Sequence, residues 1–303
     1  MKPTVSVIVI VITLIASLGA AADLVIENHP DGKVDRIESR FVPFGRENSS
    51  EIPIFSDDFE TGDTINWGDF PYSGKLTYYG GNPAGGACGY NMPVDYASTS
   101  YVDYYVAAGA DVFKDGNNCG MAIEITNAER YDPNNHSCLT RPNTTIRVIL
   151  ADRCPECPND HLDLAPVPME ALVEPGLAGT CGILSADWRF ASARLTSNIQ
   201  IQSKSGVSAY WYGLRPFSHN LPIRQVELRS SGSADWYEAL KNQGPSFYTL
   251  TGGYPLTLPL SIRLTDVNNN QVVATDVITS FDSEAYFDTG VQFSGELTGD
   301  PLQ

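Results

Sequence analysis

Two aspartates close together in the sequence carry side chains suited to chemistry on a sugar chain. Asp152 and Asp163 lie near the two ends of the short segment 152–164. Cleavage of a glycosidic bond needs a carboxylic acid that protonates the leaving oxygen, and normally a second carboxylate that activates water or attacks carbon. The function of the chain therefore depends on whether Asp163 has a working partner.

The composition limits the classes of partner. The chain has 303 residues, of which 42% are hydrophobic, and a formal net charge of −17. This length suggests two domains and is sufficient for a real core. A strongly acidic surface repels nucleic acid, anionic lipid and anionic polysaccharide, whereas it tolerates neutral sugars. We therefore expect no nucleic-acid partner, and no membrane partner once a signal is removed.

The N-terminus has the pattern of a secretory signal over residues 1–22. Lys2 supplies the positive start, residues 5–18 the apolar run and residues 20–22 the small-residue cleavage site. A membrane anchor is the alternative, but the run is short for a bilayer span, which takes roughly 20 residues. We therefore predict a secreted protein, extracellular or in a cell wall. Three Asn-X-Ser/Thr sequences predict glycosylation, at Asn48, Asn135 and Asn143.

The six cysteines all lie between residues 88 and 181. They are Cys88, Cys119, Cys138, Cys154, Cys157 and Cys181. An even number in an exported chain indicates three disulfides, with the pairing open. Zinc or redox chemistry at Cys154-X-X-Cys157 is the alternative, but zinc would require a second ligand pair at matched spacing. We predict no metal and no cofactor, and a boundary between a cross-linked domain and one without disulfides.

From Gly74 onward, short strand-like runs alternate with Gly, Asn and Pro turns. In the first half these runs are 76–79, 108–113, 121–126, 145–151 and 183–195, and residues 168–172 have the pattern of a single helix. Many short strands with few helices predict a closed barrel. After Thr196, alternation at 199–202, 224–229, 260–265 and 272–278 predicts a β-sandwich.

Five domain boundaries follow from these patterns. We predict a signal at 1–22, a partly ordered extension at 23–70, a barrel at 71–194, a sandwich at 195–295 and a C-terminal tail at 296–303. Within the sandwich, Tyr210, Trp211 and Tyr212 are predicted to lie on one strand. Tyr210 and Tyr212 would then share a face, with Trp211 on the other face unless a bulge intervenes.

Several motifs, taken in order, resemble the expansin family. They are residues 74–80 with 86–90, then 113–120, 152–164, 183–190, and finally 210–211 leading to 222–223. Over about residues 72–295, the resemblance implies an all-β chain with a six-stranded double-psi β-barrel followed by an immunoglobulin-like carbohydrate-binding sandwich. It implies a protein that loosens cell walls without hydrolysis by binding cellulose, xyloglucan or chitin. We expect it to be a monomer.

The resemblance also assigns residues in the first domain. Asp163 matches the family's essential acid, and Thr77, Tyr78 and Asp152 match its neighbours in a groove. Thr77 and Tyr78 point to alternate faces of a strand, so only one of them is expected to line the groove fully. The tyrosine that some members carry two residues after the first aspartate is Cys154 here. Among the disulfide pairings, Cys88–Cys119 is the one expected.

In the second domain the resemblance concerns aromatic rings that bind sugar. Tyr210 and Trp211 match two of three coplanar aromatics, and Lys204 matches a nearby basic residue. The third aromatic has no clean match, although Phe247 or Tyr248 could substitute. Some of these rings could instead belong to the core of the sandwich.

The second catalytic carboxylate is missing from the place where related enzymes carry it. Family-45 glycoside hydrolases have an aspartate just after the opening strand, whereas residues 78–82 here contain none. An acid without a base favours non-hydrolytic loosening, with Asp152 in a supporting role. Three alternatives stay open: an endoglucanase of the family-45 type, a lytic transglycosylase, which needs only one acid, and a passive carbohydrate-binding matrix protein.

Overall fold

The computed structural model describes residues 20–28, 34–43, 72–80, 84–158, 160–242 and 246–298. The chain divides into two compact units, Met1–Asn66 and Trp67–Gln303. The first unit contains an antiparallel hairpin of β1 (Ala20–Asn28) and β2 (Val34–Pro43). Residues 20–22 of the predicted signal lie in β1, while residues 1–19 and Asn48 lie outside the described residues. Within the residues that the structure describes, no helix has the length and apolarity needed to span a bilayer.

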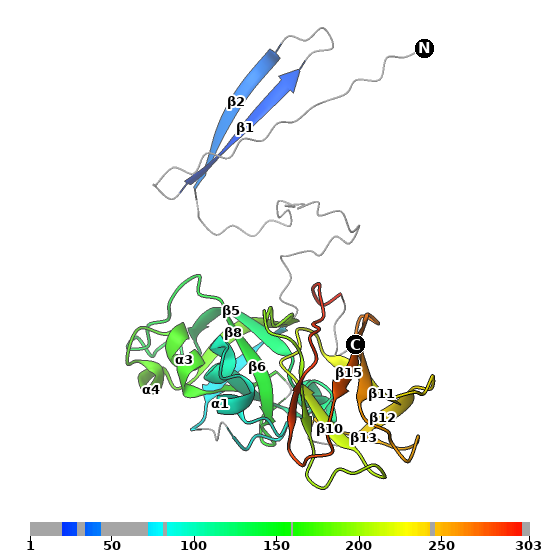
Figure 1. Cartoon of the computed structure of the whole chain (residues 1–303). Coiled ribbons are helices and arrows are strands. Elements are labelled where there is room, and N and C mark those ends of the chain that lie inside the picture. The colour runs from blue at the N-terminus through cyan, green and yellow to red at the C-terminus, as the bar shows by residue number, and fades with distance from the viewer. Residues whose placement is uncertain are drawn as a thin grey trace. The chain divides into compact units, whose positions relative to one another are not determined.

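Six strands of the second unit close into a barrel (Figure 1). They are β3 (Tyr72–Tyr78), β4 (Tyr105–Ala108), β5 (Ala122–Arg130), β6 (Ile146–Arg153), β7 (Leu162–Leu164) and β8 (Leu184–Ala191). Their order is β3-β7-β4-β6-β5-β8, and β8 returns to pair with β3. Two neighbouring pairs, β3 with β7 and β4 with β6, are parallel, and the others are antiparallel. The predicted six-stranded barrel is confirmed.

Short helices connect the barrel strands. They are α1 (Met92–Asp95), η1 (Ser100–Val102), α2 (Ala110–Phe113), η2 (Lys114–Gly116), α3 (Pro166–Leu172) and α4 (Ala178–Cys181). The helix predicted at 168–172 is confirmed as α3, which begins at a proline, a residue favoured in the first helical turn. The strand-like run predicted at 108–113 is wrong. Gly109 follows the end of β4 in an extended conformation and caps α2, and periodicity alone cannot separate such a short apolar run from a helix.

Alternation along the strands separates the barrel core from its outer surface. On β8, Leu184, Ala186, Trp188 and Phe190 are buried, and the residues between them are partly exposed. Tyr72 of β3 stacks on Trp188 with ring centroids 4.4 Å apart. Trp188 is only 1% exposed and is one of the largest side chains in the core.

Three disulfides cross-link the barrel domain, as predicted. The pairs are Cys88–Cys119, Cys138–Cys181 and Cys154–Cys157. The second pair ties the loop after β5 to α4, and the third closes a short turn between β6 and β7. All six cysteines are therefore used in structure, and the expected Cys88–Cys119 pairing is present.

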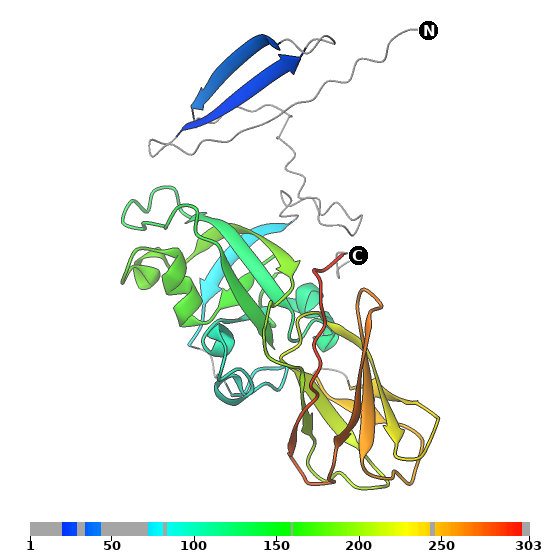
Figure 2. The same cartoon turned by 45° about the horizontal axis from the view of Figure 1, so that its top comes forward.

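Eight further strands form a second β-structure, drawn in yellow to red in Figures 1 and 2. They are β9 (Gln200–Ser203), β10 (Gly213–Phe217), β11 (Ile223–Ser230), β12 (Tyr237–Lys241), β13 (Tyr248–Leu250), β14 (Leu260–Asp266), β15 (Gln271–Ile278) and β16 (Tyr286–Asp288). Their order is β15-β14-β11-β12-β13-β10-β9-β16. Side chains from β9 to β15 share one apolar cluster, which confirms the predicted sandwich.

Buried polar contacts join the barrel domain to the sandwich. Arg215 of β10 pairs with Asp95 of α1, with 2.7 Å between Nη2 and Oδ2, and its Nη1 donates to the Gly89 carbonyl at 2.5 Å. The Ser246 N–H donates to the Cys88 carbonyl at 3.1 Å. The barrel domain and the sandwich are therefore joined by specific hydrogen bonds as well as by the polypeptide that connects them.

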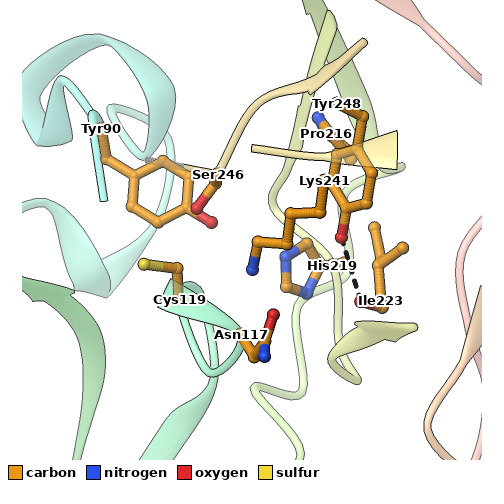
Figure 3. A pocket seen from close by; sticks show the side chains of 9 residues that line it. All are labelled: Tyr90, Asn117, Cys119, Pro216, His219, Ile223, Lys241, Ser246 and Tyr248. Atoms are coloured by element: carbon orange, nitrogen blue, oxygen red, sulfur yellow. Dashed lines mark hydrogen bonds between the residues drawn. The ribbon is translucent and has the colours of Figure 1, made fainter. Parts of the chain in front are cut away.

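A small cavity at the same boundary contains two basic side chains (Figure 3). His219 is 3% exposed, and the ammonium of Lys241 donates to the Gly116 carbonyl of the barrel domain. Burial lowers the pKa of His219 to about 4 and that of Lys241 to about 8. Lys241 is therefore charged at neutral pH, while His219 is neutral beside it.

We expect the burial of His219 to make the protein less stable in acid. Its pKa is about 4 when folded, against an ordinary 6.5, so the unfolded chain binds more protons between these values. Stability is therefore lost as pH falls from about 6.5 to about 4, by about 3 kcal/mol in total. The free energy of unfolding, measured with urea at several pH values in this range, should change less with pH for His219→Gln than for wild type. An equal dependence on pH in both proteins would contradict the prediction.

Candidate functional site

The strand register places four outward-facing residues in one row across neighbouring strands. Thr77 of β3 is opposite Asp163 of β7, which is opposite Ala107 of β4, which in turn is opposite Asp152 of β6. Adjacent strands lie about 4.8 Å apart, so the backbones of the two aspartates are separated by roughly 10 Å. We call these four residues the acidic row. The small side chain of Ala107 leaves the two acids without a bulky residue between them.

Asp163 is held at one end of the acidic row by a short hydrogen-bond chain. The Thr77 hydroxyl donates to Asp163 Oδ1 at 2.5 Å, and Thr77 Oγ1 lies 2.7 Å from His161 Nε2. Because the single hydroxyl proton goes to the carboxylate, His161 must donate through Nε2. Burial lowers the pKa of His161, although the charge of Asp163 opposes this, so the ring is neutral at neutral pH. His161 and Asp163, two residues apart, therefore both reach the Thr77 hydroxyl.

Asp152, at the other end of the row, is fixed by hydrogen bonds. Its Oδ1 accepts from the backbone N–H groups of Ala87 at 2.6 Å and Arg153 at 2.8 Å. The Tyr79 hydroxyl lies 3.5 Å from Oδ2. The two backbone donors occupy Oδ1 and fix the orientation of this carboxylate. The arrangement suits orientation of a ligand better than general-base catalysis.

Tyr79 is a site residue that sequence reasoning missed. Burial raises its pKa above the ordinary value, and the negative charge of Asp152 adds to the effect, so the hydroxyl stays protonated and able to donate. Its ring packs edge-on against Tyr105 at 6.4 Å. Tyr79 follows Thr77 by two residues, and this spacing was the available signal, since such residues share a face of a strand.

Tyr78 lies away from the acidic row. It is 37% exposed, and its hydroxyl is within 3.6 Å of the position that a Cβ on Gly179 of α4 would occupy. Thr77, by contrast, contacts Asp163 directly. The structure therefore brings Thr77 to the acid and leaves Tyr78 on the α4 side of the strand.

The predicted strand through Tyr210, Trp211 and Tyr212 is wrong. Ser208 and Trp211 exchange backbone hydrogen bonds of 2.8 and 3.3 Å across a tight turn, and Tyr210 lies at its tip. Tyr210 is 73% exposed, whereas Tyr212 is fully buried and its hydroxyl lies 2.6 Å from Ser203 Oγ. A turn at this point breaks the two-residue alternation, so the two tyrosines do not share a face.

Trp211 and Lys204 lie side by side over Gly213, and Lys204 also reaches a further aromatic ring. A Cβ on Gly213 would lie 3.1 Å from Trp211 Cη2 and 3.2 Å from Lys204 Cβ, so both side chains pass over this glycine. The Lys204 ammonium is 5.2 Å from the ring centroid of half-buried Phe247. We call Tyr210, Trp211, Phe247 and Lys204 the aromatic cluster. Tyr248, the other candidate for a third ring, is buried and donates to the Ile223 carbonyl.

If the aromatic cluster binds cellulose, as the sequence resemblance implies, Gly213→Ala should weaken adsorption to it through displacement of Trp211. The added methyl group would be closer to the indole than ordinary van der Waals contact allows, so the ring must shift. Returning the displaced ring to its original position against the added methyl group costs about 1 kcal/mol, and binding that needs this position should fall roughly fivefold. The matched control is Gly80→Ala, where a Cβ meets no atom within 4 Å. Equal adsorption of both variants, measured as depletion from solution, would contradict this.

The remaining predicted sites are placed as follows. Asn143 is exposed, whereas Asn135 is half-buried and its side-chain amide donates to the Thr180 carbonyl at 3.0 Å. In the described part of the chain, no group of three or more His, Cys, Asp or Glu side chains is arranged to hold a metal ion.

The fold defines the class of protein: a double-psi β-barrel with an acidic row, joined to an immunoglobulin-like sandwich with an aromatic cluster in which Tyr210 is exposed. A family model described as lytic transglycolase matches residues 105–184. Expansin-like protein 5 of Dictyostelium discoideum is 26% identical, covering 69% of this chain and 80% of its own. Expansin-B11 of Oryza sativa subsp. japonica is 29% identical, covering 67% and 70%.

Solved structures agree on the fold. The crystal structure of apo Clavibacter michiganensis expansin matches with a TM-score of 0.58 and 23% identity, over 74% of this chain and 98% of that one. A mutant of the same expansin in complex with cellohexaose matches with a TM-score of 0.57 and 22% identity, over the same shares. The chain is therefore similar in sequence to expansins and expansin-like proteins, and it shares the fold of the Clavibacter expansin.

Proposed function

We propose that this is a secreted protein that binds cellulose or a related neutral β-glucan and loosens cell-wall polysaccharide without hydrolysis. The observation that carries the proposal is the unequal state of the two aspartates in the acidic row. Asp163 is oriented by the Thr77 hydroxyl, whereas Asp152 already accepts two backbone N–H groups. One acid is therefore available to a ligand, and the second is poorly suited to activate water.

In this proposal the barrel domain and the sandwich bind the polysaccharide in different ways. The acidic row holds a glucan strand, with Asp163, Asp152 and Thr77 in contact with it and Tyr79 as an added donor. The aromatic cluster anchors the protein, because flat rings such as the exposed Tyr210 offer an apolar face to a sugar. A net charge of −17 supports neutral glycans over anionic ones. The cellohexaose complex of the Clavibacter expansin lends weight to this substrate class.

The test measures mechanics and chemistry on the same sample. Wild-type protein is applied to cellulose paper and to isolated cell-wall strips, with heat-denatured protein as the control. We expect the paper to weaken and the strips to extend, with no reducing ends above the control. Reducing ends that rise together with the weakening would overturn the proposal in favour of an endoglucanase.

A lytic transglycosylase is the second candidate, favoured by the match of residues 105–184 to the lytic transglycolase family model. Such an enzyme needs one acid and forms an anhydro-sugar. The hydrogen bonds that Asp152 accepts from the backbone are therefore compatible with this function. Incubation with purified peptidoglycan and mass analysis of the soluble products separates the two functions. Anhydro-muropeptides would support the transglycosylase.

A further inference from the structure

The acidic row continues past Thr77 onto two more barrel strands. On β3, Leu76 is opposite Leu184 of β8, so Thr77 faces position 183. On β5, Arg130 is also opposite Leu184, and the Tyr131 N–H donates to the Ile183 carbonyl at 3.3 Å. Tyr131, Ile183 and Thr77 therefore occupy consecutive positions of one row. This extension lies on the side of Thr77 that is away from Asp152.

A bulge in β5 is what turns Tyr131 outward. Before the bulge, Ile123 and Ile125 face the core, so the same alternation would turn residue 131 inward. The register against β8 shifts by one residue between Thr126 and Glu129, and Ala128 then faces the core instead. A shift of one residue exchanges the two faces of a strand. Tyr131 consequently reaches the surface with 48% of its area exposed.

Lys75 holds the Tyr131 ring in place. Its ammonium lies 4.6 Å from the ring centroid, a distance at which a cation is attracted to an aromatic face. Lys75 precedes Thr77 by two residues on β3, so both side chains leave the same face of the strand. Its positive charge also reaches His161, where it helps to lower the pKa of the imidazole. The Lys75–Tyr131 pair is therefore continuous with the groups that hold Asp163.

We propose that Tyr131 and Lys75 form a further sugar subsite at the Thr77 end of the acidic row. Its ligand is a neutral β-linked glycan chain that already occupies the row, so the inference rests on the proposed function. One sugar ring lies on the exposed part of the Tyr131 ring, beside the partly exposed Ile183. The Lys75 ammonium donates hydrogen bonds to its hydroxyl groups. The subsite makes binding depend on chain length.

The experiment compares a short and a long oligosaccharide by calorimetric titration. The proteins are wild type, Tyr131→Ala, Tyr131→Phe, and Leu240→Ala as a control at an exposed leucine on β12 of the sandwich. We expect Tyr131→Ala to weaken cellohexaose binding roughly threefold to tenfold, the range for one aromatic contact, and to leave cellotriose unchanged. Tyr131→Phe keeps the ring and should bind like wild type, as should Leu240→Ala.

The outcomes separate the two proposals. If wild type binds cellohexaose and Tyr131→Ala binds it equally well, the subsite is overturned while the proposed function stands. If Tyr131→Ala loses the same factor for both oligosaccharides, the residue acts on the whole row and the length-dependent subsite is also overturned. If wild type binds neither sugar, both the subsite and the proposed function fall.

Discussion

Replacement of Asp163 by alanine is expected to abolish wall loosening while most adsorption to cellulose remains. The carboxyl is the acid that the Thr77 hydroxyl orients, and its loss removes a charged hydrogen-bonding partner from the acidic row. Hydrogen bonds to charged groups contribute about 1.5–3 kcal/mol, so contacts made there should weaken roughly tenfold or more. Adsorption persists because the aromatic cluster lies in the other domain.

The measurement uses creep of wall strips under constant load, with adsorption and released sugar recorded in parallel. Asp163→Asn keeps the size of the side chain and removes the charge, so it should behave like alanine. Asp235→Asn, at an exposed aspartate of the sandwich, is the matched control and should creep like wild type. Unchanged creep in Asp163→Ala would refute the role of the acid. Sugar released by wild type but not by the variant would make Asp163 catalytic in a hydrolase.

Loss of Arg215 is expected to destabilise the protein more than loss of any exposed arginine. Its side chain is 1% exposed and that of Asp95 is fully buried. The guanidinium also donates to the Gly89 carbonyl and to Gln202 Oε1, both at 2.5 Å. Burial raises the pKa of Asp95, which the charge of Arg215 opposes. Removal of one partner of a buried pair leaves the other charge uncompensated, at a cost of about 3–5 kcal/mol.

Thermal and urea unfolding of Arg215→Leu measures this cost. Arg194→Leu is the control, because the Arg194–Glu296 pair is exposed and such pairs contribute at most about 1 kcal/mol. The double variant Arg215→Leu, Asp95→Leu should recover part of the loss, since no buried charge then remains. A destabilisation equal to that of Arg194→Leu would contradict the prediction.

The predicted runs overlap β3, β5, β6 and β8, because short strand-like runs between turn residues mark these strands in the sequence, whereas β4 and the three-residue β7 were not predicted. The run at 108–113 could not be predicted correctly, because Gly109 allows the chain to leave β4 and begin α2 without a change in apolar content. The strand through Tyr210 failed for a related reason. Three successive aromatic residues favour a strand by type, whereas the Ser208–Trp211 backbone bonds that make the turn leave no mark in the sequence.

The sequence was sufficient to predict which residues belong to the site, but not how they are arranged in space. The resemblance singled out Thr77 and Asp163, yet their contact joins residues 86 positions apart and exists only because β3 and β7 pair in parallel. Ala107 carries no chemical signal, although it separates the two aspartates. The outward direction of Tyr131 was harder to predict, since it depends on a bulge whose sole signal in the sequence is Asn127, a residue type that tolerates the positive φ found there.

The contacts between the domains determine how a mechanical load travels through the protein. Ser246, next to Phe247 of the aromatic cluster, donates to the Cys88 carbonyl, and Cys88 is covalently bridged to Cys119. The preceding residue, Ala87, donates its N–H to Asp152. In the proposed function, tension on a glucan bound to the sandwich would therefore enter the barrel at the loop that fixes one end of the acidic row. Because Arg215 and Ser246 also bond to the barrel domain, such a load would be carried by several hydrogen bonds and not by the connecting chain alone.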